Sequence, residues 1–249
     1  MITAHLKYDV QTLKACAATC FSWYNIAIPL IHRTLRLRRW VSKKFKHARP
    51  NQLPSLFKLG LLPLVKQLQL RDTPPCWIAA AIFDPRNLQY FHAMVNLQEL
   101  RIEGFDFTVL QTGFGESLGH FAPTLRSVAL AHPRGNRPQM LDFFRLFPRL
   151  DDIEIWRHFP VLDSGEVLHT QLVPIRGGLR GRLTLTEFDE EGLLECIAIA
   201  FGGVKFTFMY LRRIRGMRLL LEACSDTLET LCPHPDAIYP YQYYPSKMI

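Results

Sequence analysis

The chain has 249 residues, 48% of them hydrophobic, and a formal net charge of +8. This composition is typical of a folded protein and excludes a disordered chain. The longest nearly uncharged apolar stretch, residues 193–204, is shorter than the roughly twenty residues that cross a bilayer, and the first residues lack the order of a signal peptide, so neither membrane contact nor secretion is predicted.

Two helices are predicted at the start of the chain. Residues 12–19 are rich in good helix formers, and their apolar side chains recur at helical spacing. A second helix, at residues 21–27, should end before Pro29, because proline disfavours a helical conformation in the residue that precedes it. Trp23 is expected to pack between the two helices.

A short apolar pattern then recurs along the chain: an apolar residue, two variable residues, an apolar residue, one variable residue and a final apolar residue. Copies of this pattern and further β-like segments predict strands at residues 34–37, 65–70, 97–102, 125–130, 150–155, 182–186, 205–209 and 228–231. The helices predicted between them are residues 56–61, 77–83, 88–95, 116–121, 140–147, 190–201 and 217–225. This alternation implies a largely parallel sheet with helices on its outer side.

Self-similarity at intervals of roughly twenty to thirty residues indicates a stacked solenoid, in which each strand buries its apolar side when the next unit covers it. The predicted fold is therefore α/β, an irregular leucine-rich-repeat-like solenoid with parallel strands, preceded by a short helical segment. Irregularity is expected because strict repeats place Asn or Cys shortly after the strand, where this chain has Gly104, His132 and Arg157. Residues 158–178 are predicted to be a long loop, and the Pro- and Tyr-rich residues 233–245 an extended tail.

The positive charge is concentrated between residues 33 and 49. This segment contains no acidic residue, and its basic residues are Arg33, Arg36, Arg38, Arg39, Lys43, Lys44, Lys46 and Arg49. Such a patch, interleaved with Trp40 and Phe45, fits contact with phosphate or with an acidic protein surface. The favoured interpretation is a solvated connection whose long side chains cover apolar surface, and nucleic-acid binding is the less favoured one.

Six cysteines are scattered without a disulfide framework, which favours reduced thiols in the cytoplasm or the nucleus. Cys16 and Cys20, four residues apart, are half of a metal-ligand pattern, but no histidine completes a recognisable spacing. We therefore expect both thiols to pack as small apolar side chains, and we predict no metal site.

No motif for catalysis is recognisable. The close glycines at residues 113–115 and 177–181 lack the features of a phosphate-binding loop and are interpreted as turns. The acidic residues 189–191 stand at the start of a predicted helix, where negative charge favours the positive end of the helix dipole. The sequence therefore predicts a protein without enzymatic activity and without a cofactor.

The residues at the start of the chain match a known pattern, which consists of the strand at residues 33–37 and of Leu13, Cys16, Cys20, Trp23, Ala27, Pro29 and Leu30. With these residues, the segment 8–37 resembles the second half of an F-box, as found in fungal F-box proteins with leucine-rich repeats. The resemblance implies a substrate receptor of an SCF-type cullin–RING ubiquitin ligase. In that family the F-box docks on the adaptor subunit of the ligase, and the repeats hold the target protein.

The resemblance implies a partial F-box at residues 1–32, a repeat array at 33–232 and a tail at 233–249. A full F-box opens with a Leu-Pro segment and a helix, whereas this chain begins near the end of that helix. Because interface energy is concentrated in a few buried anchors, we expect docking of this chain alone to be weak or absent. The alternatives are a freestanding repeat scaffold without a ligase role and, less favoured, a nucleic-acid binder that uses residues 33–49.

Target recognition is predicted on the concave face of the sheet, which carries the residues that alternate with the core. The candidate residues on this face are Arg36, Arg38, Gln67, Gln69, Glu99, Arg101, Ser127, Ala129, Asp152, Glu154 and Trp156. Their charge passes from basic to acidic along the array, which would orient a partner with charges of both signs; ordinary solvated surface is the slightly favoured alternative. Trp156 is the candidate contact anchor, and its burial under the following loop is an equally simple interpretation.

Overall fold

The computed structural model describes residues 9–38, 52–71, 85–104, 107, 118–135, 137–156, 159–160, 179–188, 204–214 and 218–233. The predicted helices at 77–83 and 190–201, most of the basic segment 33–49, Arg157 and the tail after residue 233 lie outside these ranges. Within the described ranges, no helix is long and apolar enough to span a bilayer.

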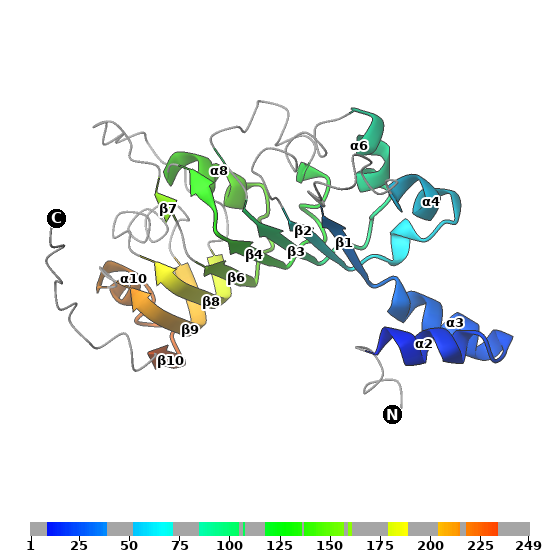
Figure 1. The fold of residues 1–249 in the computed structure, drawn as a ribbon. Helices are drawn as coiled ribbons and strands as arrows, with labels where there is room; N and C mark the ends of the chain where they lie inside the picture. Colours follow the sequence, from blue (N-terminus) through cyan, green and yellow to red (C-terminus); the bar gives the residue numbers. More distant parts are fainter. Residues whose placement is uncertain are drawn as a thin grey trace, which may run out of the picture.

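The centre of the molecule is one open sheet of eight strands, in the order β1-β2-β3-β4-β6-β8-β9-β10 (Figure 1). Their bounds are β1 Thr34–Arg38, β2 Gln67–Arg71, β3 Glu99–Glu103, β4 Ser127–Ala131, β6 Asp152–Trp156, β8 Leu179–Phe188, β9 Val204–Ile214 and β10 Thr230–Pro233. Every pair of neighbours is parallel. The predicted strands and the α/β class are therefore confirmed.

A second, short sheet pairs β5, Arg134–Gly135, with β7, Phe159–Pro160. The strand β7 lies inside the segment 158–178, which the sequence analysis treats as a loop without regular structure. That prediction is wrong for these two residues, because alternation cannot be recognised in so short a strand.

The apolar pattern becomes the buried side of the sheet. In β2, β3 and β6 each buried residue is flanked by residues that are more exposed. The register places equivalent apolar side chains next to one another in rows across the strands, one of which contains Leu68, Leu100, Val128, Ile153, Leu183 and Met209. All six of these side chains are buried, so each strand covers the apolar side chain of its neighbour.

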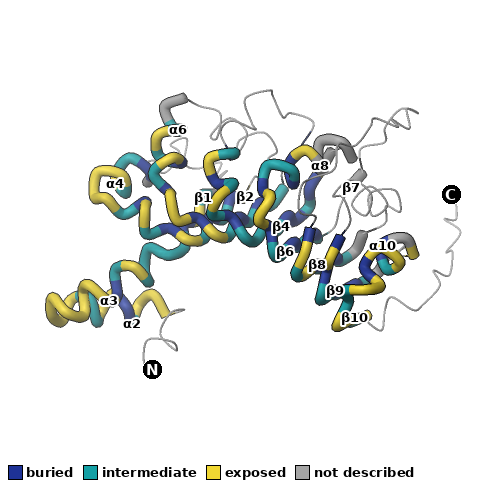
Figure 2. The backbone as a smooth tube through the Cα atoms, turned by 180° about the vertical axis from the view of Figure 1, so that it is seen from behind, coloured by how far each residue is buried: buried dark blue, intermediate teal, exposed yellow. Residues whose placement is uncertain are grey.

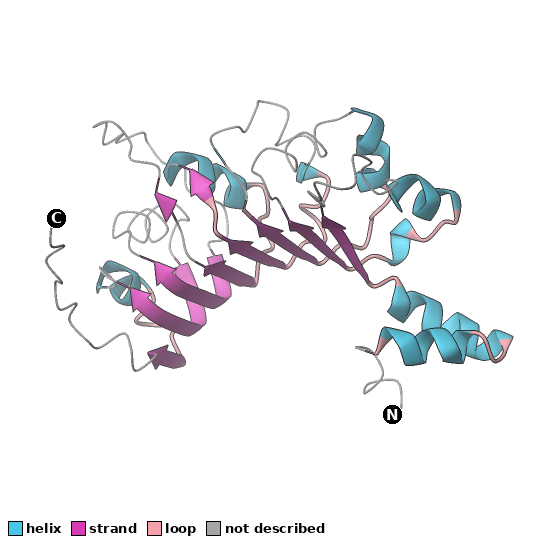
Figure 3. Cartoon of the chain, viewed as in Figure 1, coloured by secondary structure: helices cyan, strands magenta, loops and turns pink. Residues whose placement is uncertain are grey.

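The described helices beside the sheet are α4 Gln52–Lys58, α6 Pro85–His92, α8 Arg137–Arg145 and α10 Arg218–Ala223, with a single 3₁₀ turn, η1, at Leu62–Leu64. They lie on one side of the sheet (Figures 1 and 3). The helices α4, α6 and α8 begin three or four residues earlier than predicted. The reason is that Pro54, Pro85 and Pro138 occupy the first turn, where a helix does not use the missing N–H.

Between sheet and helices lies a core rich in phenylalanine. The ring of Phe143 makes edge contacts with Phe107 at 5.3 Å, with Phe144 at 5.6 Å and with Phe147 at 5.3 Å between centroids. All four rings are buried in one hydrophobic cluster that extends from β1 to α10. Figure 2 shows this buried layer along the strands, with exposed residues on the outer helices.

The chain begins with a helical hairpin of α2, Val10–Ala17, and α3, Phe21–Ile31, which projects beside β1 (Figure 1). The predicted end of the second helix at residue 27 is wrong, because α3 continues through Pro29. Proline lies in the last turn of α3, where the helix loses one hydrogen bond, and the backbone N–H of His32 still donates to the carbonyl of Ile28 at 3.1 Å.

Equivalent turns follow β3 and β4. Gly104 (φ 77°) and His132 (φ 52°) both have left-handed backbone conformations directly after their strands. Each backbone N–H donates to the last carbonyl of the next strand, Gly104 to Ala131 and His132 to Trp156, both at 2.8 Å. These are two of the positions at which the sequence analysis expects irregularity, and the backbone there is nevertheless the same.

Side chains also link consecutive units at the opposite end of the strands. The Asn96 amide donates to the carbonyl of Pro63 at 2.9 Å, and the Arg149 guanidinium donates to the carbonyl of Pro123 at 3.0 Å. Each donor immediately precedes the first apolar residue of its repeat unit. Each acceptor lies two residues before the first apolar residue of the preceding unit. The link therefore recurs at equivalent positions.

Candidate functional site

The helical hairpin exposes an unusual amount of apolar surface. Its second helix, α3, contains no charged residue. Phe21 is 78% exposed, and Tyr24 and Ile26 are also exposed. A helix without charged residues and with mainly apolar side chains is normally covered by other parts of a protein, so the exposed apolar surface of α3 is a candidate interface.

The structure separates the F-box-like residues into three groups by their burial. Leu13 and Ala27 are buried between α2 and α3, and they hold the hairpin together. Cys16 and Leu30 are half-buried, whereas the exposed residues of the set are Cys20, Trp23 and Pro29. Two expectations are therefore wrong, since Cys20 is an exposed N-cap residue of α3 and Trp23, 36% exposed, is not enclosed between the helices.

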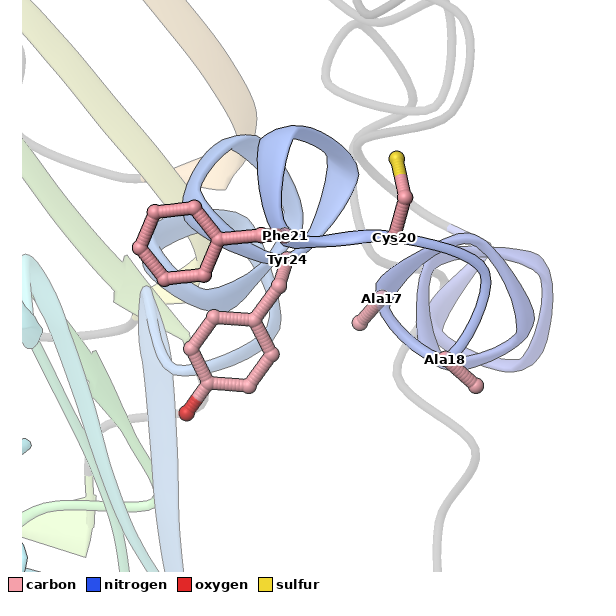
Figure 4. A pocket seen from close by; sticks show the side chains of 5 residues that line it. All are labelled: Ala17, Ala18, Cys20, Phe21 and Tyr24. Atoms are coloured by element: carbon pink, nitrogen blue, oxygen red, sulfur yellow. The ribbon is translucent and has the colours of Figure 1, made fainter.

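A shallow pocket of about 400 Å³ lies where the two helices meet. It is lined by Ala17, Ala18, Cys20, Phe21 and Tyr24 (Figure 4). The small side chains of the two alanines leave room beside the two aromatic rings. The pocket is thus suited to an apolar side chain from another protein.

The sheet has one face without a covering helix in the described part of the chain, which we call the open face (Figure 1). It carries the residues that alternate with the core, which are Arg36, Gln67, Gln69, Arg71, Glu99, Arg101, Glu103, Ser127, Ala129, Asp152, Glu154, Trp156, Arg182, Thr184, Phe208 and Tyr210. The predicted candidates other than Arg38 are all on this face. Arg38 belongs to β1, but its side chain lies outside the described part.

Two of the predicted residues meet across a strand. The guanidinium of Arg101, on β3, lies 4.3 Å from the centroid of the Trp156 ring, on β6. The strand between them, β4, contributes Ala129 and Ala131 at these positions, and their small side chains let Arg101 reach the ring. Trp156 is therefore half-buried beneath a cation rather than free.

Two half-buried carboxyl groups lie beside this pair. Burial raises the pKa of Asp152, while the charge of Arg182 and a hydrogen bond from Ser127 at 3.4 Å act in the opposite direction. Burial also raises the pKa of Glu154, against the charge of Arg101 and a hydrogen bond from the Trp156 side chain. Incomplete hydration of both carboxylates makes them suitable acceptors for a partner's donors.

The charge gradient predicted along the array holds only in part. Acidic residues on β3 and β6 follow the arginines of β1 and β2, but Arg182 on β8 restores positive charge. Two glutamates are also paired, since Arg33 lies 3.7 Å from Glu99 and Arg71 lies 3.1 Å from Glu103. The open face is thus a mixture of linked charges.

Sequence reasoning missed the part of the open face on β8 and β9. Arg182 precedes an alternating apolar pair, which is the same signal that identified the earlier strands. Phe208 gave no such signal, because a bulge between Gly181 and Arg182 shifts the pairing so that Phe206 is buried and Phe208 is not. The guanidinium of Arg182 lies 4.9 Å from the Phe208 ring centroid.

The described residues contain no group of three or more His, Cys, Asp or Glu side chains that could hold a metal ion. The cysteines in these ranges, Cys16, Cys20, Cys224 and Cys232, have free thiols. Burial raises the pKa of the Cys224 thiol. Comparisons with family models and with curated proteins found no match to this chain.

Proposed function

We propose that this chain is a non-catalytic protein-interaction module that acts as a substrate receptor of an SCF-type cullin–RING ubiquitin ligase. In this proposal the helical hairpin contacts the adaptor subunit, and the open face of the sheet holds the target protein. The observation that carries the proposal is the exposure of aromatic side chains on the uncharged helix α3. The sheet of the same chain buries a large hydrophobic core, yet these side chains remain outside it.

The proposal also treats the sheet as a leucine-rich-repeat-like solenoid. Three features support this interpretation. The strands follow one another across the sheet in chain order. The turns at Gly104 and His132 are equivalent, and the links from Asn96 and Arg149 each join two neighbouring units at equivalent positions. A surface built from such units commonly binds an extended partner.

The adaptor contact can be tested by calorimetry with the full chain and the purified adaptor subunit. Because binding energy is concentrated in exposed aromatic anchors, we expect Phe21→Ala and Trp23→Ala each to weaken binding by about tenfold or more. Leu59→Ala is the matched control, since Leu59 is 70% exposed and lies outside the hairpin. Its affinity should equal that of the unmodified chain.

Because the segment resembles only the second half of an F-box, weak binding by the unmodified chain agrees with the proposal. A folded chain that binds no adaptor at any accessible concentration would contradict the ligase role and leave a repeat scaffold. Equal weakening by Leu59→Ala would contradict the hairpin as the contact. Circular dichroism of each variant distinguishes a lost contact from an unfolded hairpin.

A further inference from the structure

We propose that the outer edge of β10, which pairs with no second strand among the described residues, binds an extended segment of a partner protein, which adds a ninth strand to the sheet. The segment carries aliphatic side chains at alternate positions and a basic residue beside Glu229. This site is at the opposite end of the sheet from the helical hairpin (Figure 1), and it does not depend on the proposed ligase role.

The proposal starts from Leu231, which is 42% exposed. Leu231 pairs with Met209 of β9 and so extends a row of core positions across the whole sheet. The other members of that row, Leu35, Leu68, Leu100, Val128, Ile153, Leu183 and Met209, are between 0% and 6% exposed. Leu231 therefore occupies a core position to which no described strand adds the next side chain of the row.

An edge position does not by itself cause this exposure. Leu35 belongs to β1, the other edge strand, and it is only 6% exposed. At the β10 edge the next core position is exposed as well, since Pro233 pairs with the buried Leu211. Both core positions of β10 are thus exposed. Burial of the Leu231 side chain by a partner strand would favour association of that strand with β10.

The edge lacks one of the usual protections against pairing, which is a charged side chain on the strand. Natural edge strands often carry lysine or other charges, whereas β10 reads Thr-Leu-Cys-Pro and has none. Pro233 has no backbone N–H, so it confines pairing to the residues before it. A short partner strand, comparable in length with the strands already present, satisfies this geometry.

Charge defines the chemistry of the partner. Two exposed acids, Asp226 and Glu229, precede β10, and neither forms an ion pair with a described residue. The nearby Glu222 is neutralised by Arg218 at 2.6 Å. The end of the edge next to Glu229 is therefore negative, and it favours a basic residue at the corresponding position of the incoming strand.

The chain itself contains a segment with these properties. If a ninth strand continued the parallel register, a peptide copying residues 65–71, Val-Lys-Gln-Leu-Gln-Leu-Arg, would place Leu68 beside Leu231 and Lys66 beside Glu229. This correspondence follows from the way in which β2 pairs with β1. The peptide is therefore a defined probe for the edge.

The test measures binding of this fluorescent peptide to the full chain by anisotropy, with amide NMR shifts to locate the site. We expect saturable binding with shifts at Thr230, Leu231 and Cys232. Leu231→Asp should weaken binding by about tenfold or more, whereas Leu59→Asp, at another exposed leucine, should not. Glu229→Lys should weaken binding of the peptide and restore it for a peptide carrying Lys66→Glu.

Three results would overturn the proposal. One is the absence of saturable binding of either peptide to the full chain. Another is equal affinity of the unmodified chain and Leu231→Asp, which would place the peptide elsewhere. The third is a concentration-dependent dimer in sedimentation that Leu231→Asp abolishes, because this would assign the edge to a second copy of the chain.

Discussion

Asp9 determines where the first helix begins. Its carboxylate accepts a hydrogen bond from the Thr12 backbone N–H at 3.0 Å and another from the Thr12 hydroxyl at 2.6 Å. These bonds lower the pKa of Asp9 from its ordinary value of 3.8. The charged form therefore stabilises the start of α2.

We predict that Asp9→Ala speeds amide hydrogen exchange in α2. Because the folded-state pKa of Asp9 is lowered, its contribution is complete above pH 3.8 and is lost as the pH falls through the folded value. The difference in exchange should therefore disappear in acid. Asp9→Asn, which keeps an acceptor oxygen, should lie between the two. A difference that persists unchanged in acid would contradict this role.

The pKa of Asp152 is shifted in the opposite direction from that of Asp9. Its raised pKa means that the folded state holds the proton more tightly than the unfolded state, so ionisation of Asp152 reduces stability as the pH rises from 3.8 through the folded value. We predict that Asp152→Asn unfolds at an equal or higher temperature than the unmodified chain at pH 7, and that any gain shrinks in acid. Thermal unfolding at both pH values measures this.

The matched control is Asp151→Asn. Asp151 lies 3.6 Å from Arg126 and 3.2 Å from Arg180, so its replacement removes two exposed ion pairs and should slightly lower the unfolding temperature. A lower unfolding temperature for Asp152→Asn at pH 7 would show that Arg182 and Ser127 outweigh burial.

At the scale of the elements, Gly181 permits the close approach of β8 to the preceding unit. Its backbone has a φ of +87°, and a Cβ atom there would lie 2.1 Å from the carbonyl oxygen of Asp151. That oxygen also accepts a hydrogen bond from the backbone N–H of Arg182 at 2.8 Å, so a shift of the oxygen would weaken this hydrogen bond. Gly181 thus lies at a bulge inside a strand, and its interpretation as part of a turn is wrong.

We predict that Gly181→Ala lowers the free energy of unfolding by about 3 kcal/mol, since the left-handed conformation and the clash both oppose it. Gly60→Ala provides the control. Gly60 has a φ of +66° but nothing within 4 Å of the added atom, so only about 1 kcal/mol should be lost. Denaturant unfolding measures both, and equal losses would exclude the clash as the cause.

The strands were predictable because alternating apolar residues can be recognised within a few residues of sequence. Each recurrence of this alternation forms a strand whose apolar side chains are covered by a parallel neighbour. The position of Phe208 was not predictable, since a bulge changes which side chains face the core without changing composition. Helix starts were misplaced where proline is compatible with the first turn. The sequence of α3 likewise gave no indication that Trp23 is exposed, because the helix has no charged residue and only a few polar ones to mark its outer face.

At the scale of the whole molecule, the hairpin and the sheet have separate cores. Leu13 and Ala27 are buried, yet neither belongs to the hydrophobic cluster that joins β1 to α10. We predict that Leu13→Ala, which removes a buried side chain worth about 2–5 kcal/mol, speeds hydrogen exchange in α2 and α3 while the sheet retains its protection.

Leu100→Ala is the corresponding change in the sheet, since Leu100 lies within the main cluster. It should lower protection in the neighbouring strands and leave the hairpin unaffected. Loss of protection throughout the molecule in both variants would instead show that hairpin and sheet unfold as one unit.

The order of the strands also bears on synthesis. Because each strand of the eight-stranded sheet lies beside the strand of that sheet that precedes it in the chain, no strand of this sheet has to be inserted between two others. During translation, each newly synthesised strand can therefore pair with the edge of the sheet that has already formed. Pairing of strands that are close in sequence also costs little chain entropy, because the loop between them is short.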